Sequence, residues 1–247
     1  MQKAKTFGLI VIGDEILYGH RRDRHFEGIG KLLRERGLSL AWLRILPDNP
    51  DYLIKELRHT MADNIPVFSC GGIGATPDDY TRACAASAAG VPLRRHGGAV
   101  TEIEERFAEE AYPLRIKMAD LPEGCELIPN PYNRIPGFSI KQHYFLPGFP
   151  DMAHPMAEWV LDNGYAVARP EIQRSVWVKG VSETALMGLM NELGEQFPEH
   201  KLFSLPRLGE QRFVELGYRG RDDFSAAFDA LLLGLQAGGF DIEVIDK

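Results

Sequence analysis

The sequence predicts an α/β protein with a mostly parallel sheet, followed by a small α+β domain of ferredoxin-like topology. Up to about residue 90, apolar strand-like runs that end in glycine or proline alternate with segments of helical periodicity. This alternation is typical of a parallel sheet covered by helices on both faces. From residue 170 onward the patterns follow the order βαββαβ, which is a split βαβ arrangement. We therefore expect two domains, residues 1–167 and 168–247.

Three strand–helix pairs open the first domain. Because parallel strands need right-handed crossovers, the loops after the three strands meet at one edge of the sheet. These loops are residues 13–25, 47–50 and 71–79, and we expect a ligand to bind there. The predicted strands are residues 6–15, 38–46 and 65–72, and the predicted helices are residues 25–37, 51–63 and 78–90.

The remaining elements follow in order. A charged helical stretch over residues 101–119 predicts a flap or an inserted subdomain. Frequent proline and glycine between residues 126 and 150 favour loops and short strands, with a last sheet strand in HYFLPG. A helix over residues 150–164 closes the domain. The second domain is predicted to have strands at 172–180, 201–209, 211–220 and 240–246, and helices at 182–197 (N-cap Ser182) and 222–239.

Composition narrows the class of protein. The 247 residues are 45% hydrophobic and 26% charged with a net charge of −7, as in ordinary globular chains, so nucleic acid and anionic membranes are disfavoured as main partners. Cys70, Cys84 and Cys125 lack a CxxC spacing, so we expect reduced thiols without a zinc site. The first apolar run is too short for a signal peptide or a membrane span, which predicts a cytoplasmic protein.

The strongest candidate site is the glycine-rich loop GGIGATPDD, residues 71–79. It has neither the ending of a P-loop nor the register of a dinucleotide fingerprint. Free backbone N–H groups between a strand and a helix can nevertheless bind an anion, and Thr76 adds a hydroxyl. Asp78 and Asp79 could cap the helix, bind Mg²⁺ that bridges a pyrophosphate, or orient a water molecule.

Two other loops bring charged residues to the same edge. Asp48 taken alone resembles a turn residue. Because it follows the second strand, however, the topology predicts that it lies at the same edge of the sheet as Asp79. Asp14 and Glu15 could support the first loop or help to hold a cation. A basic cluster follows them, which either binds phosphate or forms a solvated turn: His20, Arg21, Arg22, Arg24 and His25.

These residues resemble a known family. The first domain resembles the molybdopterin-binding-like domain of the competence/damage-inducible protein A (CinA) family, which also occurs in molybdenum-cofactor biosynthesis proteins and in eukaryotic FAD synthases. Residues 170–247 resemble the small domain that follows it in the CinA family, whose members carry a further amidase domain. The matching motifs are GDEIL with Gly19-His20, Pro47-Asp48, the loop from Gly71 to Thr81, Pro122-Glu123-Gly124, Asn130-Pro131, Pro136-Gly137-Phe138 and Leu146-Pro147-Gly148-x-Pro150.

The resemblance implies a three-layer α/β sandwich with a site for pterin or nucleotide phosphates. It implies metal-dependent hydrolysis of a nucleotide pyrophosphate such as ADP-ribose or FAD, with Asp48 and Asp79 as the catalytic pair. The metal would be Mg²⁺, Mn²⁺ or Co²⁺, held by Asp48, Asp78 and Asp79. The implied ligand-binding residues are Gly13, Asp14, Glu15, Gly71, Gly72, Gly74, Thr76, Asp78 and Thr81.

Two other functions stay open, and family analogy predicts a homo-oligomer. One is binding of a molybdopterin-type or nucleotide ligand without catalysis, and the other is an interaction domain with a vestigial cleft. The chain also departs from the family pattern, with Ala75 in place of proline, Arg24 and His25 in place of threonine and asparagine, and Asn133-Arg134 near a Gly-Thr pair. These differences point to a shifted substrate or a lost activity.

Overall fold

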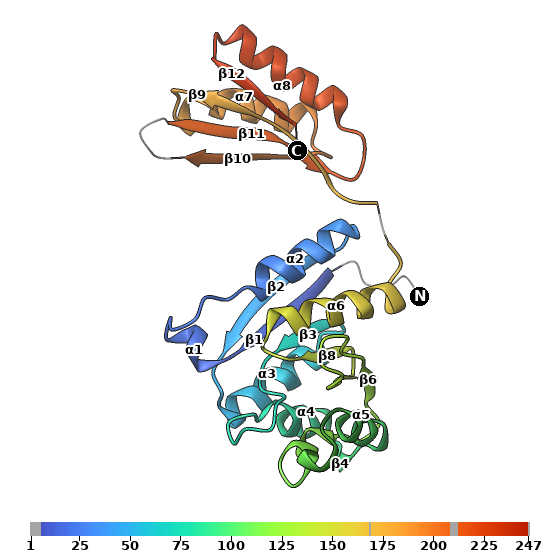
Figure 1. The fold of residues 1–247 in the computed structure, drawn as a ribbon. Helices are drawn as coiled ribbons and strands as arrows, with labels where there is room; N and C mark the ends of the chain where they lie inside the picture. The colour runs from blue at the N-terminus through green and yellow to red at the C-terminus, as the bar shows by residue number, and fades with distance from the viewer. Residues whose placement is uncertain (1–5, 168, 208–211, 247) are drawn as a thin grey trace. The chain divides into compact units, whose positions relative to one another are not determined.

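The chain divides into two compact units, Met1–Ala168 and Arg169–Lys247. The computed structural model describes residues 6–167, 169–207 and 212–246. The larger unit is an α/β sandwich of three layers, and the smaller unit is a four-stranded sheet with two helices (Figure 1). The predicted fold class is confirmed.

A six-stranded mixed sheet forms the centre of the larger unit, in the order β2-β1-β3-β8-β7-β6. The first four of these strands are parallel, whereas β7 is antiparallel to both of its neighbours, β8 and β6. All but the first residue of β1 are buried, which explains its unbroken apolar sequence. The strands are β1 (Thr6–Ile12), β2 (Ser39–Leu46), β3 (Val67–Cys70), β6 (Glu126–Ile128), β7 (Gly137–Ile140) and β8 (His143–Leu146).

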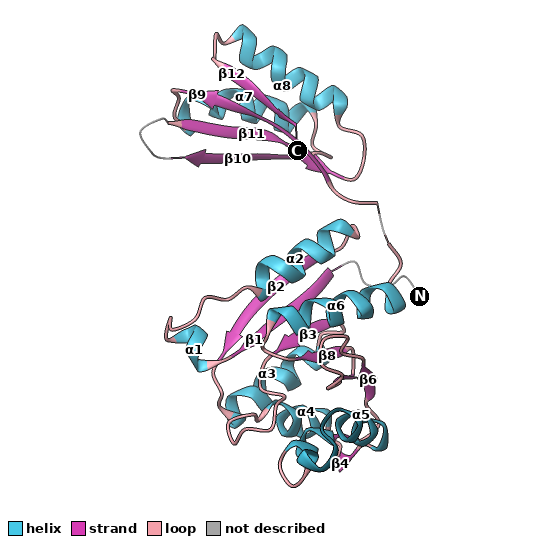
Figure 2. Cartoon of the chain, in the orientation of Figure 1, coloured by secondary structure: helices cyan, strands magenta, loops and turns pink. Residues whose placement is uncertain are grey.

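Helices cover both faces of this sheet (Figure 2). The side chains of Phe7, Leu9 and Val11 pack with α2 (His25–Glu35) and α6 (Pro150–Gly164) in one apolar cluster. Ile10 and Ile12 point the other way and pack with α3 (Pro50–Ala62), α4 (Thr81–Ala89) and α5 (Gly97–Phe107) in a second cluster. The period-two alternation of β1 therefore places one core on each side of the sheet.

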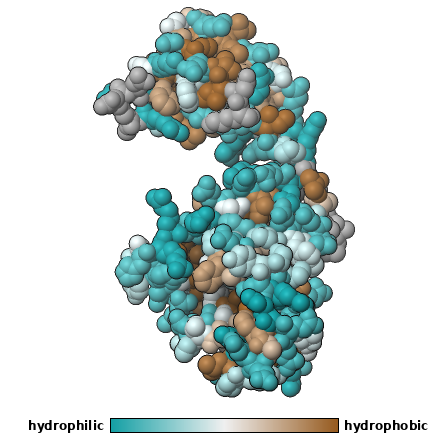
Figure 3. Space-filling view, viewed as in Figure 1, coloured by the Kyte–Doolittle hydropathy of each residue, from teal (hydrophilic) through white to brown (hydrophobic). Residues whose placement is uncertain are grey.

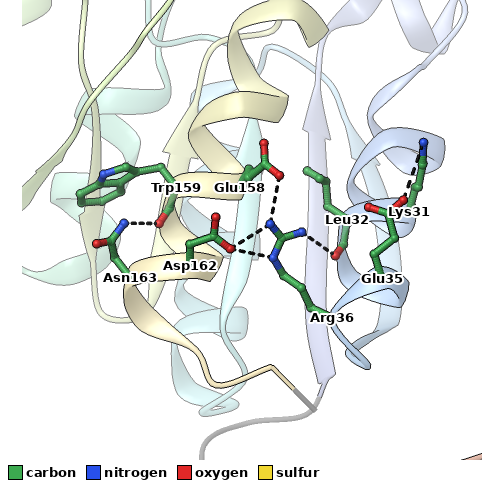
Figure 4. Close-up of polar contacts among 8 residues, drawn as sticks. All are labelled: Lys31, Leu32, Glu35, Arg36, Glu158, Trp159, Asp162 and Asn163. Carbon is green, nitrogen blue, oxygen red and sulfur yellow. Dashed lines mark hydrogen bonds and ion pairs between the residues drawn. The ribbon is translucent and has the colours of Figure 1, made fainter. Parts of the chain in front are cut away.

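An arginine joins the two helices on the first face. Nε of Arg36, directly after α2, donates to Asp162 Oδ1 at 2.8 Å, and Nη2 donates to Glu158 Oε1 at 3.0 Å (Figure 4). Both carboxylates belong to α6. Arg36 also donates to the carbonyl oxygen of Leu32, so its guanidinium closes the end of α2 while it binds the neighbouring helix.

Several elements differ from the sequence-based prediction. Helix α4 begins at Thr81, three residues later than expected. The charged stretch forms a subdomain in which α5 begins at Gly97 and is followed by the 3₁₀ helices η1 (Ala108–Ala111) and η2 (Arg115–Ala119). Ile103 and Ile116 are buried in the core, which supports the inserted-subdomain alternative. The structure adds a short helix α1 (Asp14–Leu17) and the antiparallel pair β4 (Leu93–Arg95) and β5 (Asp120–Pro122).

The smaller unit has the predicted order βαββαβ. Its sheet has the strand order β10-β11-β9-β12, and every neighbouring pair is antiparallel. Ser182 is the N-cap of α7, although its side chain makes no capping hydrogen bond. The predicted strand ends at residues 208, 209 and 211 lie outside the described residues. The elements are β9 (Ile172–Lys179), α7 (Glu183–Gln196), β10 (Lys201–Arg207), β11 (Phe213–Gly220), α8 (Ser225–Ala237) and β12 (Ile242–Asp246).

Hydrophilic residues cover most of the visible surface of each unit, with smaller hydrophobic areas between them (Figure 3). Within the described ranges, no helix has the length and apolar character needed to cross a membrane. All three cysteines are buried and free, and burial raises the pKa of the Cys84 and Cys125 thiols to about 11. These thiols therefore stay protonated at neutral pH.

Candidate functional site

The loops after β1, β2 and β3 meet at one edge of the sheet, as the topology predicts. The N–H of Gly13 donates to the carbonyl oxygen of Leu46 at 3.1 Å, which joins the first loop to the end of β2. The N–H of Gly71 donates to the carbonyl oxygen of Leu146 at 3.0 Å, which joins the glycine loop to the end of β8. A fourth loop, after β8, therefore belongs to the same edge.

A cavity of about 450 Å³ opens at this edge. Asp48 and Asp79 line the same cavity as Gly72, so the two carboxylates face one space beside the glycine loop. Eight of the predicted site residues line it: Glu15, Asp48, Gly71, Gly72, Gly74, Thr76, Asp78 and Asp79.

Two glycines in the loop have no room for a side chain. Gly71 has φ +118°, and a Cβ there would lie 2.3 Å from the carbonyl oxygen of Ile12. Gly72 has φ +67°, and its Cβ would lie 2.3 Å from Thr81 Oγ1. Both values of φ also disfavour any residue other than glycine. The loop is thus held close to β1 and α4.

Four successive amides of the loop face no acceptor. Within the described part of the chain, the N–H groups of Gly72, Ile73, Gly74 and Ala75 make no hydrogen bond. Consecutive free N–H groups between a strand and a helix form a concave site for an anion. The glycine spacing predicts such free amides, and the binding of an anion by them stays a prediction.

The loop is supported by Arg82, a residue that the sequence reading did not select. Its guanidinium is buried on α4, where Nη2 donates to the carbonyl oxygen of Gly74 at 2.7 Å. Nη1 donates to the carbonyl oxygens of Lys117 and Asp120. Arg82 therefore ties the glycine loop to the inserted subdomain and fixes the direction of the neighbouring amides.

Asp79 is partly engaged within the loop itself. Its Oδ2 accepts hydrogen bonds from Thr76 N at 2.8 Å and from Thr76 Oγ1. The carboxylate therefore braces the turn at residues 76–79, which accounts for the late start of α4. Asp78 is exposed at the cavity rim, and neither aspartate is the N-cap of α4, which is Tyr80.

Asp48 lies in a crowded acidic environment. Its Oδ2 accepts the N–H of Asp14 at 3.0 Å, and its own N–H donates to Asp14 Oδ1 at 3.4 Å. Burial, and then the negative charges of Asp14, Glu15 and Asp78, raise the pKa of the Asp48 carboxyl above its usual range. A cation bound beside Asp48 would relieve this repulsion.

The acidic residues offer the oxygen ligands that a hard divalent cation takes, but too few to hold it alone. In the part of the chain that is described, no three His, Cys, Asp or Glu side chains are grouped closely enough to hold a metal ion, so Asp48, Asp78 and Asp79 do not form a complete metal site. Mg²⁺, however, is commonly held by one or two carboxylates together with substrate phosphates and water. The pairing of carboxylates with free amides suits that mode.

Three predicted residues lie outside the cavity lining, namely Gly13, Asp14 and Thr81. Asp14 acts on the cavity indirectly, because it holds the backbone and carboxylate of Asp48. The Oγ1 of Thr81 is buried below Gly72 and has no hydrogen-bond partner among the described residues.

The lining also includes residues that the sequence motifs contain but that the sequence analysis does not assign to the site. They are Asn130, Asn133 and the segment after β8, residues 147–149. In parallel sheets, ligands bind at the loops that follow the carboxyl ends of the strands. This criterion also applies to the fourth loop, because β8 is parallel to its neighbour β3.

The basic residues of the first loop separate into two groups. Arg21 lines the cavity, with its guanidinium 3.9 Å from Glu15. Arg22, Arg24 and His25 line a neighbouring cavity of about 330 Å³. His20 is exposed and lines neither. Of the pair that departs from the family pattern, Asn133 lines the first cavity, whereas Arg134 forms ion pairs with Glu102 and Glu105.

The sandwich of three layers and the glycine loop at the edge of its sheet define an α/β domain of the molybdopterin-binding type. The family model described as "Probable molybdopterin binding domain" matches residues 8–172, and the chain belongs to this family. The resemblance that the sequence motifs predict is confirmed.

Similar proteins extend the comparison. A CinA-like protein of Geobacter sp. (strain M21) is 34% identical over 161 residues, which cover 62% of this chain and 39% of that protein. A protein of Caldivirga maquilingensis is 30% identical over 192 residues, covering 75% of each chain. The crystal structure of CinA from Thermoplasma acidophilum, a protein described as having unknown function, is 28% identical with a TM-score of 0.59, covering 65% of this chain and 98% of that one. This chain thus matches well under half of the Geobacter relative.

Proposed function

We propose that the cavity catalyses metal-dependent hydrolysis of a nucleotide pyrophosphate, of the size and chemistry of ADP-ribose or FAD. One observation carries this proposal: Asp48, Asp79 and the free amides of the glycine loop face a single cavity. A pyrophosphate offers two anionic groups, one for the amides and one for a cation beside the carboxylates. A similar pairing is used at other phosphoryl-transfer sites.

Each part of the site has a distinct role in this proposal. The amides of residues 72–75 bind one phosphate, while Arg82 holds the loop that presents them. Asp48 and Asp79 face the second phosphate and hold the cation. The bound divalent ion supplies charge neutralisation and lowers the pKa of a coordinated water. Asp48 must be ionised for this role, so its raised pKa moves the acid limb of the activity upward in pH.

A second function, ligand binding without turnover, is favoured by the hydrogen bonds that the Asp79 carboxylate already makes. Its Oδ2 already accepts two hydrogen bonds from Thr76, as in a purely structural brace. A molybdopterin-type ligand or a nucleotide could then bind to the amides without being cleaved. The family description, a probable molybdopterin binding domain, agrees with this alternative.

The two functions are separated by measuring turnover and binding on the same protein. AMP release from ADP-ribose and FAD is measured with Mg²⁺, Mn²⁺ or Co²⁺, and with EDTA. Hydrolysis predicts AMP only when a divalent ion is present. In Asp48→Asn the rate should fall at least about 100-fold, because the cation loses several kcal/mol of transition-state stabilisation. The amide oxygen of the new residue can still accept the Asp14 N–H.

Asp51→Asn is the matched control, because Asp51 is exposed in the first turn of α3 and lines no part of the cavity. It should keep the full rate. Binding of ADP-ribose by calorimetry, with no AMP released under any metal, would establish the second function instead. Absence of both binding and turnover would reject both.

A further inference from the structure

A second cavity of about 330 Å³ adjoins the candidate site. The two cavities share the walls formed by Ile12, Glu15, Arg21, Gly148 and Phe149. A ligand in the first cavity can therefore extend along the same sheet edge into the second. Beyond the shared wall, the lining of the second cavity differs from that of the first, because it contains the charged residues Arg22, Asp23 and Arg24 in place of the glycine loop.

The acidic side chains of the second cavity are mostly engaged, whereas two of its arginines are available. Asp23 accepts the N–H groups of His25 at 2.8 Å and Phe26 at 3.1 Å, so it caps the start of α2. Glu15 faces Arg21.

Asp151 lies in the first turn of α6, where the helix dipole offsets its charge. Arg22 and Arg24 are exposed, and their side chains have no ion-pair or hydrogen-bond partner within the described ranges. The formal charges of the lining balance, with three carboxylates and three arginines, but these two guanidinium groups have no direct partner among the described residues and are free to bind an anion.

The turn that carries the arginines is held in place from below. His25, which follows Arg24, is only 4% exposed, and its Nε2 donates to the carbonyl oxygen of Gly148 at 3.2 Å. The ring of His154, on α6, packs edge-on to the ring of His25 with centroids 5.6 Å apart.

His154 also lies against Gly28, where an added Cβ would be 2.0 Å from its Cε1. The arginine turn is thus anchored to the loop that forms the wall of both cavities. Because the backbone of this turn is already held in place, binding an anion there orders the two arginine side chains but not the loop that carries them.

We propose that the second cavity is a subsite for a phosphomonoester on the same ligand. This inference rests on the proposed function, and it assigns the substrate class: nucleotide pyrophosphates that carry an additional, separate phosphate on a sugar. The pyrophosphate occupies the amides and carboxylates of the first cavity. The phosphomonoester, close to a dianion at neutral pH, binds the forked donors of Arg22 and Arg24.

A pair of ligands that differ by one phosphate tests the subsite. ADP-ribose and ADP-ribose 2′-phosphate are titrated into the full chain by calorimetry, at low ionic strength and without a divalent ion, so that neither is consumed. The phosphorylated ligand should bind about tenfold more tightly, since two exposed charge pairs each contribute modestly. Added salt should reduce this preference. In Arg22→Gln/Arg24→Gln the preference should disappear while the affinity for ADP-ribose stays within about twofold.

Arg34→Gln/Lys55→Gln is the matched control, because it removes the same charge from exposed positions on α2 and α3 that line neither cavity. It should keep the preference. Equal binding of the two ligands by the unmodified chain overturns the subsite and leaves the proposed function intact. A preference that survives in Arg22→Gln/Arg24→Gln also overturns it. Failure to bind either ligand in this metal-free titration overturns the subsite, whereas the proposed function is decided separately by AMP release in the presence of a divalent ion.

Discussion

Asp14 shows how a residue outside the cavity determines what the cavity can do. It exchanges two hydrogen bonds with Asp48, through the backbone N–H and side-chain carboxylate of each residue. This exchange couples the GDE motif after β1 to the single aspartate after β2. The carboxylate of Asp48 is therefore fixed in direction but also crowded by negative charge, which is the state that a cation would relieve.

A buried histidine gives the larger unit a measurable pH dependence. His143 is fully buried in β8, where its Nδ1 donates to the carbonyl oxygen of Lys141 at 3.0 Å and its Nε2 accepts from Thr60 Oγ1 at 2.9 Å. Burial lowers the pKa of His143 from 6.5 to about 4. The unfolded state therefore binds a proton that the folded state does not bind between pH 6.5 and 4.

The stability of the protein should fall as the pH falls through this window. The decrease in the free energy of unfolding that His143 causes is absent above pH 6.5. It reaches about 2 kcal/mol at pH 5 and approaches about 3 kcal/mol below pH 4. In His143→Gln this share of the loss should vanish, so the free energy of unfolding should change less between pH 7 and pH 5. Urea unfolding followed by circular dichroism at both pH values measures the difference.

At the scale of single residues, the sequence could locate glycines and acids but not long side chains. Gly71, Gly72 and Asp48 follow strands, so topology alone sends them to one edge. Arg82 sits in a helix of small residues, and no pattern in the sequence shows that its guanidinium reaches back to the carbonyl oxygen of Gly74. Such a contact depends on tertiary packing between α4, the loop and the inserted subdomain.

At the scale of elements, the contact between α2 and α6 determines how the second cavity is built. Both helices begin at the site edge, where His25 and His154 meet. At the other end, Arg36 is bound to two carboxylates of α6 (Figure 4). The two contacts hold the helices at both ends, so a change at Arg36 can be used to test how much this packing contributes to stability.

Removal of the Arg36 charge should destabilise the larger unit by about 1 to 2 kcal/mol, since its guanidinium is shielded and makes charge-assisted bonds with two acids. Arg36→Met keeps most of the apolar stem, and chemical unfolding measures the loss. The Arg36 side chain is 14% exposed, whereas Lys31, which faces Glu35 at 3.7 Å on α2, is 70% exposed. Lys31→Met should therefore cost less than about 0.5 kcal/mol. Equal losses in the two variants would show that burial does not strengthen the Arg36 pairs.

Element boundaries were predictable where one local signal dominated. Helix α2 ends just before Gly37, whose φ of +65° is the left-handed value that glycine favours after a helix. Helix α4 begins later than the sequence predicts because Asp79 binds Thr76 in a turn and does not cap the helix. The short strands β6 and β7 were not located individually, because their positions depend on antiparallel pairing to the edge of the sheet.

At the scale of the whole molecule, both cavities belong to one unit. Every residue that lines them lies between Val11 and Met152, inside the unit Met1–Ala168. The smaller unit has its own apolar core, whose buried residues come from both of its helices and from β9 and β11 and include Tyr218 and Phe228. The βαββαβ order and the alternation in β11 were sufficient to predict that unit, whereas nothing in its sequence indicates a ligand. The predicted homo-oligomer stays a prediction.

The division of the chain predicts that ligand binding survives removal of the smaller unit. A fragment of residues 1–168 should bind ADP-ribose with a Kd within about twofold of the full chain, because no lining residue is lost and both clusters that flank the six-stranded sheet are retained. Circular dichroism first establishes that the fragment is folded, and calorimetry then compares the two affinities. A folded fragment that binds at least about tenfold more weakly would show that residues 169–247 contribute to the site. A fragment of residues 169–247 should bind no ADP-ribose, which gives the comparison its baseline.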